Sequence, residues 1–440
     1  MVPSKRVYIL LTSGIILATT LAIFLSIPSS IAITLLLDIV VLGLLVVDGL
    51  RVRSHRVEIS RELPPRLSIG QDNPVFLNVK SANTNAVVQI SDYYPSEFKV
   101  SVPTLRATVA NNTTQELTYT VHPTQRGEFS WGDIQIRQLG SWGLAWDNWK
   151  IPQSLTVKVY PDLIGLRSLS IRLTLQSSGV NRQRQLGIGT EFAELRNYRT
   201  GEDLRFIDWK ATARRLGAGN TSPLVRVLEP EKEQTLLILL DRGRLMTARV
   251  QNLQRFDWGL NATLSLALAG LYRGDRVGVG VFDRQMHAWI SPERGQHHLS
   301  QLIDRLTPIQ PVLLESDYLG AVTNFVKQQT RRCLVVIITD LVDVTASAEL
   351  LAALTKLAPR YLPFCVTLRD PQVDYLAQTP TEGETIAAYT RAVALDLLAQ
   401  RQLAFAQLKQ KGVLVLDAPA NQITNQLVDR YLLLKARNQL

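Results

Sequence analysis

Cysteine and histidine are scarce in this 440-residue chain, which has two cysteines and five histidines. Cys333 and Cys365 each lie inside an apolar run, with no second cysteine or histidine at the spacing of a metal site. We expect two buried thiols and no disulfide framework. His297 and His298 begin an expected helix, where solvated surface positions are favoured over metal binding.

Catalytic sequence motifs are also missing. The chain has no glycine-rich loop ending in Gly-Lys-Ser/Thr, no His-Glu-x-x-His and no Gly-x-Ser-x-Gly. These patterns mark phosphate loops, zinc peptidases and serine hydrolases. We therefore predict a protein that is not an enzyme and that holds no cofactor. A metal-assisted hydrolase is the alternative from a different class.

Charge is absent from Val7 to Leu37, and the apolar character continues to Leu50. Pro28-Ser29-Ser30 divides this region into two segments, 7–27 and 31–50, each long enough to cross a hydrocarbon core about 30 Å thick. We predict a transmembrane helical hairpin in residues 1–56. A cleaved signal peptide is disfavoured because the first apolar run is long and a second follows at once.

Basic residues flank only the outer ends of the predicted hairpin, at Lys5 and Arg6 and again at Arg51, Arg53 and Arg56. The positive-inside rule then places both termini and the soluble domains in the cytoplasm, on an inner membrane.

Two aspartates interrupt the apolar character of the second predicted span. Asp38 lies within it and is expected to pack against the first span, another copy or another membrane protein, with transport chemistry as the alternative. Asp48 lies near the cytoplasmic end and is expected to reach water.

The net charge of +10 permits binding to anionic surfaces without demanding it. The arginines that follow the second span are suited to anionic lipid head groups. No basic and aromatic motif of a known nucleic-acid reader is present, so we expect no specific nucleic-acid partner.

Residues 57–165 contain short alternating runs separated by turn residues, which predicts a β-sandwich-like domain. Trp142, Trp146 and Trp149 crowd together near its end. We interpret them as a packing seam against a neighbouring part of the protein, and binding of a sugar or a partner is the alternative.

Residues 166–230 form a predicted arginine-rich linker. Within it, residues 201–210 alternate charged and apolar side chains. A solvated connector and a docking surface are both consistent with this composition, because arginine and tryptophan often anchor interfaces.

Residues 231–440 alternate apolar runs with helical patterns, which predicts a doubly wound α/β domain with a mostly parallel sheet. Ligands of such sheets bind beyond the carboxyl ends of the strands. An aspartate follows each apolar run, and we expect most of these to be loop or helix-capping residues. The five are Asp241, Asp283, Asp340, Asp370 and Asp417.

The stretch from Gly189 to Arg214, GTEFAELRNYRTGEDLRFIDWKATAR, closely resembles the signature of the bacterial "domain of unknown function 58" family. The resemblance continues through Val225-Arg226 and Glu229 to the strand ending at Asp241. The candidate docking residues of this signature are Gly201, Asp203, Arg205, Asp208, Trp209 and Lys210.

This resemblance implies a domain similar to von Willebrand factor type A domains, which often bind a divalent ion through Asp-x-Ser-x-Ser and a later aspartate. Asp241 matches the first position and Asp340 the last, but Gly243 and Leu245 replace the two serines. We expect no metal ion, with Asp241 and Asp340 as weak candidates and a metal-gated adhesion module as an alternative function.

The resemblance also implies a protein partner, because family members are often encoded beside MoxR-type AAA+ ATPases. The sequence thus predicts a non-enzymatic, membrane-anchored scaffold or adaptor that docks such an ATPase. The oligomeric state and the physiological process do not follow from these residues.

Overall fold

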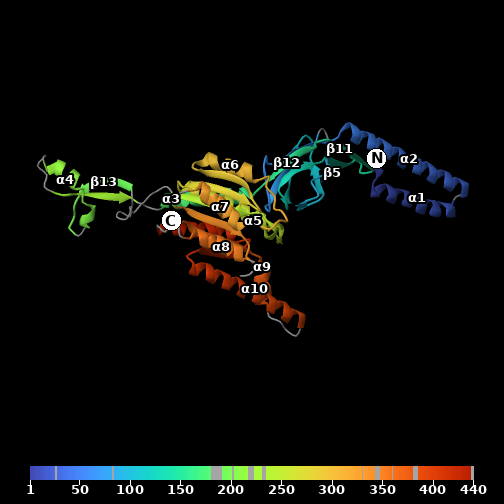
Figure 1. The fold of residues 1–440 in the computed structure, drawn as a ribbon. Coiled ribbons are helices and arrows are strands. Elements are labelled where there is room, and N and C mark those ends of the chain that lie inside the picture. Colours follow the sequence, from blue (N-terminus) through green and yellow to red (C-terminus); the bar gives the residue numbers. More distant parts are fainter. Residues whose placement is uncertain are drawn as a thin grey trace. The chain divides into compact units, whose positions relative to one another are not determined.

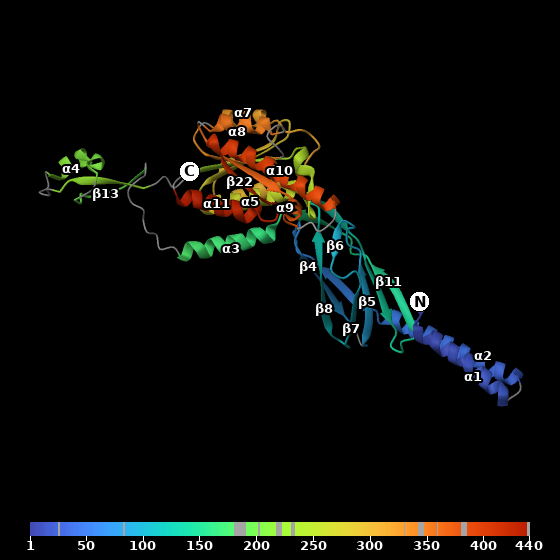
Figure 2. The same ribbon diagram turned by 90° about the horizontal axis from the view of Figure 1, so that it is seen from below.

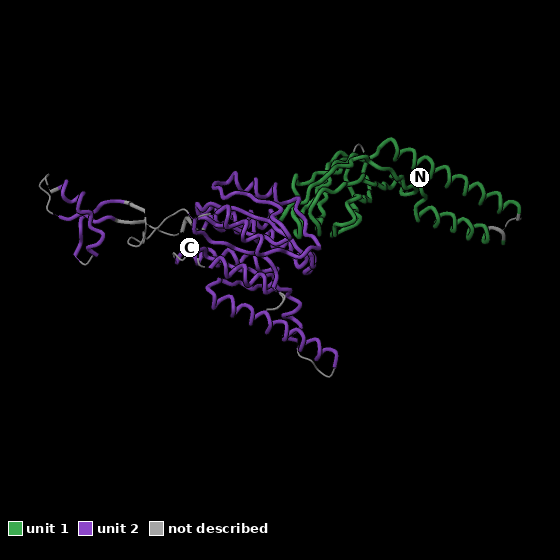
Figure 3. The backbone as a smooth tube through the Cα atoms, in the orientation of Figure 1, with its two compact units in different colours: residues 1–162 green, residues 163–440 purple. Residues whose placement is uncertain are grey.

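The structure is a computed structural model of residues 1–440. It describes all of them except residues 25–26, 82–83, 180–190, 201–202, 217–221, 230–233, 330, 342–346, 359, 380–384 and 438–440. The chain divides into two compact units, Met1–Asp162 and Leu163–Leu440 (Figure 3).

Two helices begin the first unit, α1 (Lys5–Phe24) and α2 (Ile27–Ser54), after the short strand β1 (Val2–Pro3). Pro28 lies in the first turn of α2, where its missing N–H costs no hydrogen bond. Helix α2 continues past the predicted end at residue 50. Among the described residues, one helix is long and apolar enough to cross a membrane, over Pro28–Ser54. The role of α1 as a second span stays a prediction.

Three small sheets follow the helices and form the predicted β-rich part, with orders β1-β11-β10-β5-β7, β2-β4-β8-β6 and β3-β12-β9. Along β4 every second side chain is buried, as expected for a strand with one face in a core. The strands are β2 (Glu58–Glu62), β3 (Leu67–Ser68), β4 (Asn73–Lys80), β5 (Ala86–Asp92), β6 (Phe98–Val100), β7 (Leu105–Val109), β8 (Thr114–Pro123), β9 (Gly127–Trp131), β10 (Ile134–Leu139), β11 (Ala145–Ile151) and β12 (Leu155–Tyr160).

A buried polar cluster around Asp92 lies in the core of these sheets. Arg61 forms an ion pair with Asp92 at 2.5 Å, and both side chains are almost fully buried. Tyr119 donates its hydroxyl to the same carboxylate, and Trp131 donates its indole N–H at 3.2 Å. Burial and the adjacent carboxylate raise the pKa of the Tyr119 phenol. The cluster satisfies a charge that the core would otherwise leave unpaired.

The second unit contains a six-stranded sheet of order β19-β18-β15-β20-β21-β22 (Figure 1). Strands β15 (Thr235–Asp241), β18 (Arg276–Phe282), β20 (Leu334–Thr339), β21 (Leu362–Arg369) and β22 (Leu414–Pro419) are parallel. Edge strand β19 (Met286–Glu293) is antiparallel to β18. The predicted doubly wound α/β fold with a mostly parallel sheet is confirmed, and the antiparallel edge strand is a feature that the apolar runs did not reveal.

Helices cover both faces of this sheet, as Figures 1 and 2 show. Helix α5 (Arg255–Tyr272) packs on one face and is buried along most of its length, with α3 (Leu163–Gly179), α6 (Gln296–Leu306) and α11 (Ile423–Ala436) beside it. On the other face, α7 (Tyr318–Gln328), α8 (Ala348–Leu357) and α10 (Thr385–Gln410) contribute Phe325, Leu350 and Phe405 to one apolar core. The short α9 (Pro371–Gln378) follows β21.

Candidate functional site

The family signature folds as a small module, which we call the signature module. Strands β13 (Glu191–Asn197) and β14 (Leu224–Glu229) pair antiparallel, and the 3₁₀ turn η1 (Leu204–Phe206) and helix α4 (Trp209–Leu216) lie between them in sequence. The chain segment predicted as a linker therefore carries regular structure. Gly201, one of the predicted docking residues, lies outside the described residues.

Three signature residues stabilise the signature module itself. Asp203 caps η1 by accepting from the Arg205 backbone N–H, and it also pairs with the Arg205 guanidinium at 2.6 Å. Asp208 accepts from the backbone N–H of Ala211 at the start of α4 and pairs with Arg226 of β14 at 2.8 Å. These contacts lower the pKa of Asp208, the Ala211 hydrogen bond being the largest cause. Both aspartates are thus engaged within the module.

Four other signature side chains are exposed, whereas Ile207 and Thr212 are buried. Trp209 is 66% exposed although it is the largest apolar residue of α4, and Leu204 is 62% exposed. Phe206 and Lys210 are also exposed. We call Leu204, Phe206, Trp209 and Lys210 the exposed signature face. Tryptophan and phenylalanine are enriched in protein interfaces, and Trp209 and Phe206 are both exposed here.

The second predicted site lies at the carboxyl ends of the parallel strands, where Asp241 ends β15. Its carboxylate accepts four hydrogen bonds, from the Ser316 hydroxyl (2.5 Å), the Thr339 hydroxyl (2.7 Å), the Gly243 N–H (2.8 Å) and the Tyr318 hydroxyl (2.9 Å). Burial raises the pKa of Asp241 despite these donors. The donors come from three separate segments and occupy both carboxylate oxygens.

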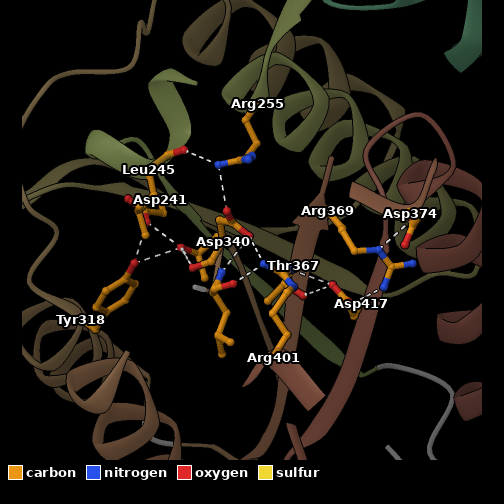
Figure 4. A network of polar contacts seen from close by, with 12 residues as sticks. Asp241, Leu245, Arg255, Tyr318, Asp340, Thr367, Arg369, Asp374, Arg401 and Asp417 are labelled. Atoms are coloured by element: carbon orange, nitrogen blue, oxygen red, sulfur yellow. Dashed lines mark hydrogen bonds and ion pairs between the residues drawn. The ribbon is translucent and has the colours of Figure 1, made fainter. Parts of the chain in front are cut away.

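Asp340 follows β20 at the neighbouring strand end, and two guanidinium groups hold it (Figure 4). Arg255 at the start of α5 lies 2.8 Å from Oδ2, and Arg401 of α10 lies 2.9 Å from Oδ1. Arg401 also reaches Asp417 at 2.8 Å, and Arg369 pairs with Asp417 at 2.6 Å. We call these five residues the strand-end ion-pair network.

These residues do not fit a divalent cation. Guanidinium groups occupy both oxygens of Asp340, and hydrogen-bond donors occupy both oxygens of Asp241. In the part of the chain that the structure describes, no three His, Cys, Asp or Glu side chains are grouped so as to hold a metal ion. A Cβ atom at Gly243 would lie 2.0 Å from the Ser316 hydroxyl, so a serine there would need the loop to move. We derive no metal chemistry from this site.

Sequence reasoning missed the arginines of the strand-end ion-pair network. Arg255 and Arg401 lie 85 and 61 positions from Asp340 in the chain, so no local spacing connects them to it. One sequence feature could have predicted Arg401 as part of this site. This arginine lies on the buried side of α10, close to buried Ala404 and Phe405. Ser316 and Tyr318 likewise come from the segment before α7 and from its first residue.

The other strand-end aspartates behave as ordinary structural groups. Asp370 caps α9 by accepting from the Gln372 N–H, and Asp283 pairs with Arg242 at 2.7 Å. Asp417 lies inside β22, not after it.

The expectation that His298 is solvated was wrong, since this side chain is buried and its Nε2 lies 2.7 Å from the Val277 carbonyl oxygen.

The C-terminal end of α2 packs against the loop before β11. Asp48 is fully buried and accepts from the backbone N–H groups of Trp142 (3.1 Å), Leu144 (3.0 Å) and Ala145 (3.1 Å). The prediction that Asp48 reaches water was wrong, because three backbone N–H groups that are distant in sequence donate hydrogen bonds to its carboxylate.

The end of α2 and the residues just after it pack at the predicted tryptophan seam. The Arg51 and Arg56 guanidinium carbons lie 4.4 Å and 4.9 Å from the ring centroids of Trp142 and Trp149. Asp38 lies close to the first helix, since a Cβ atom at Gly14 would lie 3.4 Å from its Oδ1, and its role in membrane packing stays a prediction.

Residues 194–387 match the family model described as "Protein of unknown function DUF58". The uncharacterized protein Mb1516 of Mycobacterium bovis is 22% identical over 213 residues, which cover 47% of this chain and 65% of that protein. An uncharacterized protein of Mycobacterium tuberculosis, Rv1480, matches to the same extent. The chain thus spans just under two thirds of the length of these relatives.

Among solved structures, an aerotolerance-related membrane protein from Bacteroides fragilis is 15% identical, with a TM-score of 0.30 over 45% of this chain and 99% of that chain. The SpRpn10 VWA domain is 12% identical, with a TM-score of 0.29 over 45% of this chain and 94% of that chain.

Proposed function

We propose, from the match of residues 194–387 to the DUF58 family model, that this chain is a non-enzymatic, membrane-anchored scaffold. Its exposed signature face docks a cytoplasmic protein partner, a MoxR-type AAA+ ATPase. The predicted hairpin anchors it in the inner membrane with both termini and the soluble domains in the cytoplasm.

The exposure of Trp209 is the observation that carries the docking proposal. Two ion pairs, Asp203 with Arg205 and Asp208 with Arg226, hold η1 and α4 in place while Trp209 itself packs on little of the module. Leaving an indole in water forgoes roughly 1.5–3 kcal/mol of burial free energy on the scale of large apolar side chains. A partner that covers Trp209 recovers that free energy.

The charge of the exposed signature face supports an acidic partner surface. Lys210 is exposed beside Trp209, and Arg214 follows one helical turn later on α4. Basic side chains around an aromatic anchor favour encounter with an acidic patch and add little affinity of their own. The ATPase surface is therefore expected to present an apolar pocket rimmed by Asp and Glu.

The strand-end ion-pair network supports the non-enzymatic part of the proposal. Its carboxylates are neutralised by arginines from two helices and by Arg369 of β21, so none is positioned as a free general base. The network is the kind of buried charge cluster that fixes helices to strand ends.

Site-specific photo-crosslinking tests the docking proposal in intact membranes. A photoreactive amino acid at position 206, beside Trp209 on the exposed signature face, is expected to crosslink to the MoxR-type ATPase. A probe at position 389, on an exposed tyrosine of α10, is the matched control and is expected to give no such product. Equal crosslinking at both positions, or none at 206, contradicts the proposal.

A further inference from the structure

Two arginines at the ends of the apolar helices converge on Trp142, and we propose that they bind the phosphate of an anionic phospholipid head group. The site consists of Arg6 before the apolar part of α1, Arg51 at the end of α2 and Trp142 between them. The inference assumes that the hairpin spans a membrane, and it is independent of the docking of an ATPase.

The geometry around Trp142 brings the two guanidinium groups to one residue. The Arg51 guanidinium carbon lies 4.4 Å from the Trp142 ring centroid, and Arg6 Nη1 lies 3.5 Å from the Trp142 carbonyl oxygen. Arg6 and Arg51 are both exposed, and Trp142 is 40% exposed. Two exposed positive charges therefore lie close to the same residue, Trp142.

Two nearby arginines, Arg53 of α2 and Arg56 just after it, show what is distinctive about this pair. Arg56 forms an ion pair with buried Asp147 at 2.9 Å, and Arg53 lies 3.6 Å from the same carboxylate. Within the described residues, neither Arg6 nor Arg51 has a carboxylate at ion-pair distance. Both guanidinium groups are therefore available to bind an external anion. Guanidinium groups bind phosphate through paired hydrogen bonds.

The loop that carries Trp142 is held in place before any ligand arrives. Asp48 accepts three of its backbone N–H groups, and the Ser4 hydroxyl donates to the Gly143 carbonyl at 2.6 Å. Gly143 has a φ of +72°, and a Cβ atom there would lie 2.7 Å from Arg6 Nη1. The positive φ favours glycine at this position, and a larger residue there would displace the Arg6 guanidinium.

The depth of the site matches a lipid head group. The uncharged stretch begins at Val7, one residue after Arg6, and the apolar part of α2 ends at Leu50, one residue before Arg51. Both guanidinium groups therefore lie at the boundary between hydrocarbon and water. Tryptophan side chains concentrate at this boundary, and basic residues there attract anionic lipids.

Lipid titration of the full-length protein, followed by native mass spectrometry from detergent, tests the proposal. The wild type is expected to retain phosphatidylglycerol in preference to phosphatidylcholine. Each guanidinium contributes about fivefold to the affinity, so Arg51→Gln binds phosphatidylglycerol about fivefold more weakly and Arg6→Gln/Arg51→Gln about thirtyfold more weakly.

Lys150→Gln is the matched control, because Lys150 is an exposed cation 5.4 Å from the ring centroid of Tyr93, on another part of the β-rich region. It is expected to bind phosphatidylglycerol as the wild type does. Inorganic phosphate is expected not to displace the lipid, which distinguishes a head-group site from a site for free phosphate. Equal lipid retention by the wild type and the double variant, equal loss in Lys150→Gln, or displacement by inorganic phosphate overturns the proposal.

Discussion

Arg401 Nη1 lies 2.9 Å from Oδ1 of Asp340, and both side chains are buried beneath α10. The same guanidinium reaches Asp417 inside β22, so one arginine of α10 connects the end of β20 to a second strand. In other folds of this kind the corresponding edge is where ligands bind. Here the ion pairs of Arg401 with Asp340 and Asp417 occupy that edge.

Arg401→Ala is expected to destabilise the α/β domain by about 1–3 kcal/mol, because buried Asp340 and partly buried Asp417 lose their shared cation and keep one arginine each. Native-state hydrogen exchange of the β20 and β21 amides measures this change. Arg430→Ala removes an exposed arginine from α11 and should change the stability by less than about 0.5 kcal/mol. Similar effects of both substitutions contradict the account.

Asp241 is expected to make the folded protein less stable as the pH rises. Burial raises its pKa in the folded state, so the folded protein binds a proton more readily than the unfolded chain. Stability is then lost as the pH rises from about 4 through the raised pKa. In urea unfolding at several pH values, the wild type should lose stability relative to Asp241→Asn as the pH rises. A wild type that gains stability relative to Asp241→Asn as the pH rises contradicts this prediction.

Divalent cations are expected not to bind tightly to the strand ends, because Arg255 and Arg401 already neutralise Asp340. Calorimetric titration with Mg²⁺, Mn²⁺ and Ca²⁺ measures this directly. Tight binding that Asp241→Ala abolishes would be the contrary result, and it would favour a metal-gated module.

Asp48→Ala is expected to release the loop before β11 from α2. The substitution leaves the amides of Leu144 and Ala145 without their acceptor. Hydrogen exchange of these two amides should accelerate at least about tenfold, which corresponds to about 1.4 kcal/mol of local opening free energy. Glu116→Ala, an exposed acid of β8, should leave them unchanged. Unchanged protection in Asp48→Ala contradicts the described contact.

The sequence predicted those parts of the fold that depend on local pattern. The apolar runs of β15, β20 and β21 are continuous because both faces of their sheet are covered, and such runs are visible without any partner. Asp48 was misjudged because its partners lie nearly a hundred residues away in a loop. The family signature pointed to both Asp208 and Trp209. Only the structure shows that Asp208 stabilises the start of α4 while Trp209 faces solvent.

The affinity of the full-length protein in lipid nanodiscs for a purified MoxR-type ATPase tests the central claim most directly. Truncation of an anchoring tryptophan typically costs at least about 2 kcal/mol, so Trp209→Ala should weaken binding about thirtyfold or more. Tyr389→Ala, which removes an equally exposed aromatic ring from α10, should bind as the wild type does. No measurable binding by the wild type, or equal affinity for Trp209→Ala and the wild type, would contradict the claim that the exposed signature face docks the ATPase.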